Sequence, residues 1–312
     1  MNDTFRAYGE AAAGWLAEPA THAHDAADAL HAFGFADAIA DAEPGDQAAM
    51  AASVGIEMGK ALAVGPLVEA VAAELCHVAG GGPAQSGFDP LHGAAWDDAV
   101  AVPYARPGAH VLIERRVDGV PVIGRVQLAD DTQTILQADG TVLGLVRPGD
   151  AFAVVLRYSA AAAAALQVRE LLLVSTSARL LGVAERCLAV VREHIATRVQ
   201  FGKTLASFQA LQHVMVDMHI EATLARALLE RVVQDWTALE RRGACLLALK
   251  GQATAAARLA CRKGVQLMGA IGFTEEGPVS PCLKHALVLG ARYGGEARCR
   301  AAYRQDPIDL FD

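Results

Sequence analysis

The sequence predicts an α+β protein that is mostly helical. Apolar residues recur at helical intervals near the start of the chain and again from about residue 160, and several short β-rich runs lie between these two parts. At 312 residues the chain is long enough for two or three domains, each with its own core. We expect a helical domain over residues 1–82, a β domain over 83–158 and a bundle of four helices over 159–312.

The composition excludes several classes of protein. The formal net charge is −8, which argues against a surface devoted to nucleic acid. The chain has no uninterrupted apolar run of ~18 residues, so we expect no membrane-spanning helix and no membrane partner. The six cysteines form no C-x-x-C pair and the ten histidines have no metal-ligand spacing, which favours a cytoplasmic protein with reduced thiols and no metal. No nucleophile elbow, P-loop or Rossmann fingerprint is present.

The first 82 residues are expected to form short helices. Asp46 suits the N-cap of a helix that follows the break at Pro44-Gly45, because its carboxylate can accept a hydrogen bond from a free backbone N–H. Gly65-Pro66 interrupts the pattern, and helical spacing then resumes up to Val78.

The middle of the chain changes to short β-rich runs. Asp118-Gly119 and Asp139-Gly140 lie between such runs and predict tight hairpin turns, in which both central residues need a positive φ. The expected strands cover residues 100–103, 110–114, 120–123, 133–136, 142–146 and 151–156.

Helical patterns return from about residue 160. The first helix is expected to run to about Arg198, with Gly202 just after it as the left-handed residue of the C-terminus. The second helix is expected to begin near Ser207, a good N-cap, and to end at Arg241-Arg242-Gly243, where positive charge suits the helix dipole. A third helix is expected over residues 244–268. Ser280-Pro281 predicts the start of a fourth, because proline suits the first turn of a helix.

Two stretches carry the most specific signal. The first is Arg198-Val199-Gln200-Phe201-Gly202-Lys203, followed by Ser207-Phe208-Gln209-Ala210-Leu211-Gln212-His213, and the second runs from Gln266 to Glu276. The first resembles the Arg-x-Gln-Phe-Gly-Lys…Phe-Gln…Gln-His signature of the acyl-CoA dehydrogenase family. The second resembles that family's Gln-x-x-Gly-Gly-x-Gly-Phe/Tyr segment. The resemblance is clear from about residue 165 to residue 303.

The resemblance implies an acyl-CoA dehydrogenase-like fold: a short N-terminal helical domain, a small middle β-barrel domain and a C-terminal four-helix bundle. It also implies FAD as the cofactor and an acyl-CoA thioester as the substrate. In the family, the two stretches reach the pyrophosphate and adenosine ends of the FAD of a partner subunit. The residues that the resemblance assigns to cofactor binding are Arg198, Gln200, Phe201, Gln209, Gln266, Gly269 and Ala270.

The chain departs from the family in the segments that hold its own flavin. Neither a Thr-Glu-Pro-x-x-Gly-Ser-Asp-like loop nor a Trp-x-x-Asn-Gly-like strand is present, and Trp96 is followed by two aspartates. We therefore expect that this chain lacks the part of a flavin site that binds the isoalloxazine ring.

The chain also departs from the family at the catalytic base. The family's Tyr-Glu-Gly-Thr-like segment reads Tyr293-Gly294-Gly295-Glu296 here, so a glycine occupies the position of the base. Glycine cannot accept a proton, although its N–H could still donate to the thioester oxygen. Glu170 and Glu296 are weaker candidates for the base. Glu170 is about two residues out of register on its helix, and both are expected to be surface carboxylates.

These features predict the smaller, base-deficient subunit of a heteromeric acyl-CoA dehydrogenase. A larger subunit would supply the base in an α2β2 assembly, the family's usual electron acceptor would be an electron-transferring flavoprotein, and the shortened N-terminal domain would suit a bulky acyl chain such as a steroid side chain. One alternative is a homomeric dehydrogenase with an unusual base such as Glu170. Another is a non-catalytic assembly or binding protein that retains the fold.

Overall fold

The computed structural model divides into two compact units, which are described separately. The helical unit contains residues 1–18, 48–63 and 173–306, and the β unit contains residues 19–47, 64–172 and 307–312. The structure describes residues 3–17, 38–39, 41–65, 88–89, 100–104, 107–108, 110–117, 120–146 and 152–304. The sequence-predicted helix up to Val78 and the last eight residues lie outside this described part.

The β unit contains two sheets that share one core. The first sheet has the strand order β1-β3-β4-β7 and the second has the order β2-β6-β5. Their shared core consists of apolar side chains from both sheets: Val102, Val111, Ile113, Val126, Leu128 and Val146. The strands are β1 (Phe88–Asp89), β2 (Val100–Pro103), β3 (His110–Val117), β4 (Val120–Gln127), β5 (Thr134–Leu136), β6 (Val142–Val146) and β7 (Phe152–Arg157).

Of the two predicted hairpin connections, the one between β3 and β4 has the expected length and the one between β5 and β6 is longer. Strands β3 and β4 pair with Val117 opposite Val120, which leaves two connecting residues; the predicted turn residues Asp118-Gly119 themselves lie outside the described part. Strands β5 and β6 are joined by residues 137–141, so the connection is longer than predicted. Gly140 has a φ of 90°, but Asp139 acts through its side chain, whose Oδ1 accepts a hydrogen bond of 2.9 Å from the Thr141 N–H.

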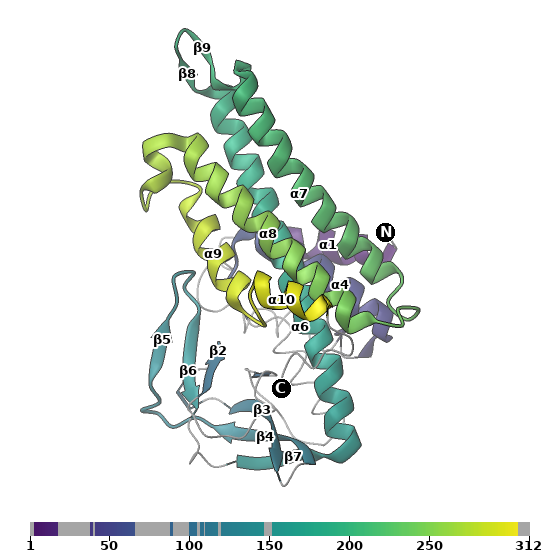
Figure 1. Cartoon of the computed structure of the whole chain (residues 1–312). Helices are drawn as coiled ribbons and strands as arrows, with labels where there is room; N and C mark the ends of the chain where they lie inside the picture. The colour runs from purple at the N-terminus through teal and green to yellow at the C-terminus, as the bar shows by residue number, and fades with distance from the viewer. Residues whose placement is uncertain are drawn as a thin grey trace. The chain divides into compact units, whose positions relative to one another are not determined.

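The helical unit is built on three long helices with shorter ones beside them (Figure 1). Two helices, α4 and α6, also begin in residues of the β unit. Among the described helices, none has both the length and the apolar character that crossing a bilayer requires. The helices are α1 (Asp3–Leu16), α4 (Pro44–Ala61), α6 (Tyr158–Thr197), α7 (Gln209–Gln234), α8 (Arg242–Met268), α9 (Ser280–Ala291) and α10 (Glu296–Arg304).

Helices α4 and α6 cross at glycines. A Cβ atom added to Gly59 would lie 2.9 Å from the Cα of Gly182, and one added to Gly182 would lie 2.9 Å from the Cα of Gly59. Only hydrogen atoms can occupy this contact, so the two backbones approach more closely than larger residues allow. Nearby, the Ser53 hydroxyl of α4 donates a hydrogen bond of 2.5 Å to the Phe5 carbonyl, which attaches α1 to α4.

Two predicted helix boundaries in the bundle were wrong. Helix α7 begins at Gln209, and Phe208 is its N-cap without a side-chain hydrogen bond. Ser207 instead belongs to a short 3-10 helix, and its hydroxyl donates to the Thr204 carbonyl at 2.7 Å. At the other end, α7 stops at Gln234, and Arg242 is the first residue of α8, not part of the end of α7.

The predicted fourth helix is short and is followed by a fifth. Pro281 occupies the first turn of α9 as predicted, but Ser280 is already helical and Val279 is the N-cap. Helix α9 has 12 residues, and α10, which the sequence patterns did not indicate, has nine. The predicted set of four long helices is therefore three long helices and two short ones.

Candidate functional site

The first signature stretch forms a tight β hairpin at the end of α6. Strand β8 (Val199–Gln200) pairs with β9 (Lys203–Thr204), and Figure 1 shows this hairpin projecting beyond the ends of α6 and α7. The two residues between the strands, Phe201 and Gly202, have φ values of 54° and 80°. Two successive positive φ angles define the turn that matches the twist of a two-residue hairpin. Gly202 is therefore a turn residue of this hairpin, and the prediction that it ends α6 was wrong.

Local contacts hold the hairpin against the start of α7. The Leu205 N–H donates to the Arg198 carbonyl at 2.9 Å. The Phe201 and Phe208 rings meet edge to face with their centroids 6.2 Å apart, and the Lys203 ammonium lies 4.3 Å from the Phe208 ring centroid. The Phe201 side chain nevertheless remains 89% exposed. The hairpin thus presents an aromatic ring to solvent from a strained backbone conformation.

The second signature stretch forms the sharp end of α8. Gly269 is the C-cap with a φ of 66°, and its N–H donates to the Gln266 carbonyl. A Cβ atom at Gly269 would meet nothing within 4 Å, so the backbone conformation, not crowding, is what favours glycine there. At Gly272, in contrast, a Cβ atom would lie 2.5 Å from the Val265 carbonyl oxygen. The two glycines keep this turn compact for different reasons.

The two stretches meet around one cavity of about 630 Å³. Five of the seven predicted cofactor-binding residues line it: Arg198, Gln200, Gln266, Gly269 and Ala270. The other two, Phe201 and Gln209, do not line it and are exposed at the hairpin tip and at the first turn of α7. The remaining lining residues are His194, Leu205, Leu211, Val214, Leu267, Met268 and Ile271.

The polar side chains that line this cavity differ in whether they already form hydrogen bonds or ion pairs within the protein. The Gln200 amide donates to the Val199 carbonyl at 2.8 Å. Within the described part of the chain, the Arg198 guanidinium forms no ion pair and the Gln266 side chain forms no hydrogen bond. The cavity therefore offers one cation and one amide to an anionic, hydrogen-bonding ligand.

The candidates for a catalytic base lie in different settings. Gly294 has a φ of 93° and follows Tyr293, whose φ is 54°. Glu296 is the first residue of α10 and forms ion pairs with Arg258 at 2.7 Å and Arg300 at 3.0 Å. These pairs link α8 to α10 and leave Glu296 without the open setting that proton abstraction needs.

Glu170 is not the surface carboxylate that the sequence predicted. It is only 7% exposed and lies in the part of α6 that belongs to the β unit. The position of Glu170 on its helix predicts the direction of its side chain, but does not show which neighbouring segments cover it.

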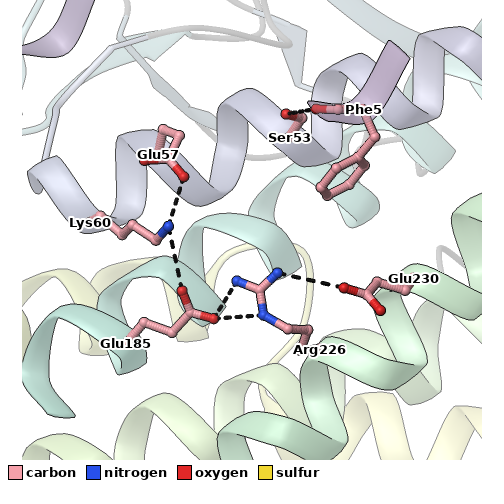
Figure 2. Close-up of polar contacts among 7 residues, drawn as sticks. All are labelled: Phe5, Ser53, Glu57, Lys60, Glu185, Arg226 and Glu230. Carbon is pink, nitrogen blue, oxygen red and sulfur yellow. Dashed lines mark hydrogen bonds and ion pairs between the residues drawn. The ribbon is translucent and has the colours of Figure 1, made fainter. Parts of the chain in front are cut away.

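A chain of charges that the sequence did not indicate joins three helices (Figure 2). Lys60 of α4 lies 2.7 Å from Glu57 and 3.7 Å from Glu185 of α6. Arg226 of α7 binds the same Glu185, with its Nε 2.9 Å from Oε1, and lies 3.6 Å from Glu230. The Lys60–Glu57 pair at i,i+3 and the Arg226–Glu230 pair at i,i+4 have a local spacing that could have suggested them, whereas the two pairs with Glu185 do not.

Two further observations concern the chemistry of the helical unit and of the described part of the chain. A second cavity, of about 700 Å³, lies along α6 and α7 and is lined mostly by apolar side chains, with the Glu185–Arg226 pair among them. In the part of the chain that the structure describes, no cluster of His, Cys, Asp and Glu side chains could hold a metal ion.

The sequence of the helical unit matches a known family. Residues 173–298 match the acyl-CoA dehydrogenase C-terminal domain. Acyl-CoA dehydrogenase IpdE2 of Mycobacterium tuberculosis is 39% identical over 100 residues, which are 32% of this chain and 30% of that protein. IpdE2 of Mycolicibacterium smegmatis is 34% identical over 110 residues, which are 35% of this chain and 34% of that protein. The chain thus spans about a third of the length of these curated relatives.

Solved structures resemble nearly the whole chain. The ChsE4–ChsE5 complex from Mycobacterium tuberculosis has a TM-score of 0.75 at 17% identity, covering 96% of both chains. Butyryl-CoA dehydrogenase from Megasphaera elsdenii has a TM-score of 0.74 at 15% identity, covering 97% of this chain and 98% of that one. A variant of the Tcur3481–Tcur3483 steroid ACAD has a TM-score of 0.72 at 18% identity, covering 96% and 94%.

Together these comparisons define the class of protein. The chain has the acyl-CoA dehydrogenase fold, mostly helical with a smaller β part, as the sequence predicted. In sequence, residues 173–298 are similar to the C-terminal domain of the acyl-CoA dehydrogenase family.

Proposed function

We propose that this chain is one subunit of an FAD-dependent acyl-CoA dehydrogenase and that it completes the nucleotide end of a flavin site on a partner subunit. The observation that carries the proposal is the cavity at the hairpin. Arg198 and Gln200 line it from the hairpin, and Gln266, Gly269 and Ala270 line it from the end of α8. Residues separated by more than 60 positions in the sequence thus converge on one open site.

The residues of the cavity suit a dinucleotide. A guanidinium is permanently charged and donates hydrogen bonds in a fork, which fits a diphosphate. The Gln266 amide can bond to polar groups of an adenosine moiety, and the Gly269 turn lets backbone approach the ligand. Phe201, exposed beside the cavity, offers a flat apolar surface to a ring or to a partner subunit. When bound, FAD would supply the hydride acceptor for α,β-desaturation of the thioester.

The chemistry of the reaction also favours a partner. Removal of a proton α to a thioester needs a carboxylate within hydrogen-bonding reach of that carbon. Gly294 has no side chain, and Glu296 is held between Arg258 and Arg300. We therefore assign the base and the isoalloxazine contacts to a larger acyl-CoA dehydrogenase subunit, in an α2β2 assembly with an electron-transferring flavoprotein as the acceptor.

The names of the structural neighbours support this assignment. The ChsE4–ChsE5 complex and the Tcur3481–Tcur3483 steroid ACAD are each named for two components, and the latter is named for a steroid. Their likeness to this chain is consistent with a cytoplasmic subunit of a heteromer that acts on a bulky acyl group, in fatty acid or steroid side-chain oxidation.

The test is the flavin content of the chain expressed alone and with the candidate larger subunit. We expect colourless protein alone and one FAD per pair after co-expression, with acyl-CoA turnover only in the pair. Arg198→Ala should reduce FAD occupancy of the pair, and Arg192→Ala, which alters an exposed arginine of α6 shortly before Arg198, should not. A colourless pair without turnover would contradict the proposal and favour a non-catalytic assembly protein.

The burial of Glu170 supports one second candidate, a homomeric dehydrogenase. The Glu170 carboxyl group is 7% exposed and so lies largely away from water, as a base in a dry substrate pocket would. This alternative predicts yellow, active protein without a partner, and Glu170→Gln would abolish its turnover while FAD stays bound.

A further inference from the structure

Lys250 of α8 is a fully buried cation. Its side chain is 0% exposed, and in the described part of the chain it forms no ion pair with a carboxylate. Its Nζ atom lies 3.2 Å from the Thr254 hydroxyl, 3.1 Å from the Gly290 carbonyl and 3.5 Å from the Gly294 carbonyl. The three protons of the ammonium group thus have three oxygen acceptors, one of which belongs to its own helix.

The two carbonyls that Lys250 binds mark the ends of one turn. Gly290 is in the last turn of α9, whose final carbonyls have no partner within the helix, and Gly294 precedes α10. Between them the backbone has the unusual φ values of 54° at Tyr293 and 93° at Gly294. Such a conformation persists only where the surroundings hold it, and Lys250 holds it from both sides.

The contact with Gly294 also acts on a neighbouring donor. The Gly294 carbonyl accepts from Lys250 and from the Cys299 thiol, the latter at 3.5 Å. The same peptide group carries the Gly295 N–H, and a cation on the carbonyl strengthens that N–H as a donor. Within the described residues, neither the Gly294 N–H nor the Gly295 N–H donates to an acceptor. The turn therefore has two backbone N–H groups that donate to no described residue, beside a carbonyl that binds a buried cation.

We propose that Lys250 is a positioning residue that fixes this turn and polarises the peptide group between Gly294 and Gly295, so that the turn can bind the carbonyl oxygen of a thioester. The choice of a thioester as the ligand rests on the proposed function, whereas the role of Lys250 in holding the turn rests on the geometry alone. Lys250 cannot itself be the missing base, because its amine is enclosed by protein atoms and engaged by three oxygens.

The groups around Lys250 change its pKa in opposite directions. Burial lowers the pKa of Lys250 to about 8; the Cys299 thiol opposes this shift and the Arg292 guanidinium adds to it. Glu296, the first residue of α10, is already paired with one arginine of α8 and one of α10. At pH 7 the ammonium form prevails. A ligand oxygen at the turn would stabilise that charge, so ligand binding should weaken as pH rises through about 8.

The first experiment measures how fast backbone amides of the turn exchange hydrogen in the absence of a ligand. Hydrogen exchange of the segment 290–298 is compared in the wild-type protein, in Lys250→Met and in Lys263→Met, which changes a partly exposed lysine on the same helix. We expect Lys250→Met to speed exchange of the turn at least about tenfold and Lys263→Met to leave it unchanged. Equal protection of the turn in all three proteins would overturn the positioning role.

The second experiment tests whether the carbonyl oxygen of the ligand contributes to binding. Acetyl-CoA is compared with S-ethyl-CoA, which lacks that oxygen, by calorimetry on the protein purified with its partner. We expect acetyl-CoA to bind about tenfold more tightly in the wild type, and Lys250→Met to remove the difference. In the wild type the difference should also shrink between pH 7 and pH 9, a result that needs no variant. If Lys250→Met speeds exchange of the turn but the wild type binds acetyl-CoA no more tightly than S-ethyl-CoA, a thioester is refuted as the ligand. The role of Lys250 in positioning the turn would then still stand.

Discussion

Gly59 of α4 and Gly182 of α6 meet backbone to backbone, and the first prediction concerns this contact. A Cβ atom at Gly182 would lie 2.9 Å from the Gly59 Cα and closer still to the Ile56 carbonyl oxygen. Because backbone atoms cannot rotate away, Gly182→Ala must push the helices apart. We expect a loss of about 3 kcal/mol in the free energy of unfolding, measured by urea denaturation.

Gly243→Ala is the matched control for that measurement. Gly243 is also helical, but a Cβ atom there would meet nothing within 4 Å. Alanine is the better helix former by about 1 kcal/mol, so this variant should be neutral or more stable. Equal effects of the two substitutions would show that the α4–α6 contact does not depend on the absence of side chains.

The second prediction concerns Glu185, which joins Lys60 and Arg226. Glu185→Gln removes both ion pairs at once and should lower the free energy of unfolding by about 1 kcal/mol, since the pairs are only partly exposed. The effect should shrink in 1 M salt because the charges are within reach of solvent ions. Glu193→Gln, at an exposed position of the same helix, should change stability little at either salt concentration.

The third prediction is that Gly294→Glu does not create an active enzyme from this chain alone. The φ of 93° at this position is unfavourable for any residue with a Cβ atom. We expect both Gly294→Ala and Gly294→Glu to lower stability by about 1–2 kcal/mol in thermal unfolding. Turnover of acyl-CoA by Gly294→Glu without a partner would contradict both this prediction and the assignment of the base to another subunit.

The fourth prediction concerns three thiols that meet in the core of the helical unit. Cys187, Cys261 and Cys282 come from α6, α8 and α9 and are fully buried. A hydrogen bond with Cys261 and burial raise the pKa of Cys187, and a hydrogen bond with Cys187 and burial raise that of Cys282. Because the thiolate is the reactive form, these thiols should resist a disulfide reagent in the native protein.

Counting reactive thiols tests this directly. Cys245 is partly exposed and should react quickly, whereas Cys299, whose pKa is raised by burial, should not. Cys76 lies outside the described residues, so the measurement uses a Cys76→Ser background. We expect one thiol per chain before denaturation and five after it. Rapid reaction of more than one thiol would show that the core opens readily.

The fifth prediction follows from the sign of the Lys250 shift. Its pKa is about 8 in the folded protein, against 10.5 for an ordinary lysine, so the unfolded chain binds more protons between these values. The contribution of Lys250 to stability should therefore rise with pH from about 8 to 10.5, by at most about 3 kcal/mol. Urea titrations at pH 7 and pH 10 should show this rise in the wild type and lose it in Lys250→Met.

Five of the seven residues that the sequence singled out line one cavity, although the local structure around them differs from the prediction. The signature identified Arg198 and Gln266, and the structure brings them to one cavity although the sequence separates them widely. The role of Gly202 was misread because a helix end and a hairpin turn demand the same positive φ. Arg241-Arg242 were placed at the wrong helix because arginines favour a C-terminus but can also precede a first turn.

Features that depend on distant partners were not predictable from local patterns. Lys60 and Glu185 are 125 positions apart, and Lys250 and Gly294 are 44 apart, so neither contact leaves a periodic trace in the sequence. Glu170 was expected on the surface because its helical position alone does not reveal what packs over it. Such contacts form only when the chain folds, so they can be identified only in the structure.

The hairpin has a consequence for how cells must make this protein. Phe201 is 89% exposed and Phe273, in the short 3-10 helix after α8, is 81% exposed, while Ile271 of the same 3-10 helix lines the cavity. Apolar surface of this kind promotes self-association when nothing covers it. If the proposed partner subunit covers this surface, copies made in excess of that partner would tend to aggregate, and matched synthesis of the two chains would raise the yield of soluble protein.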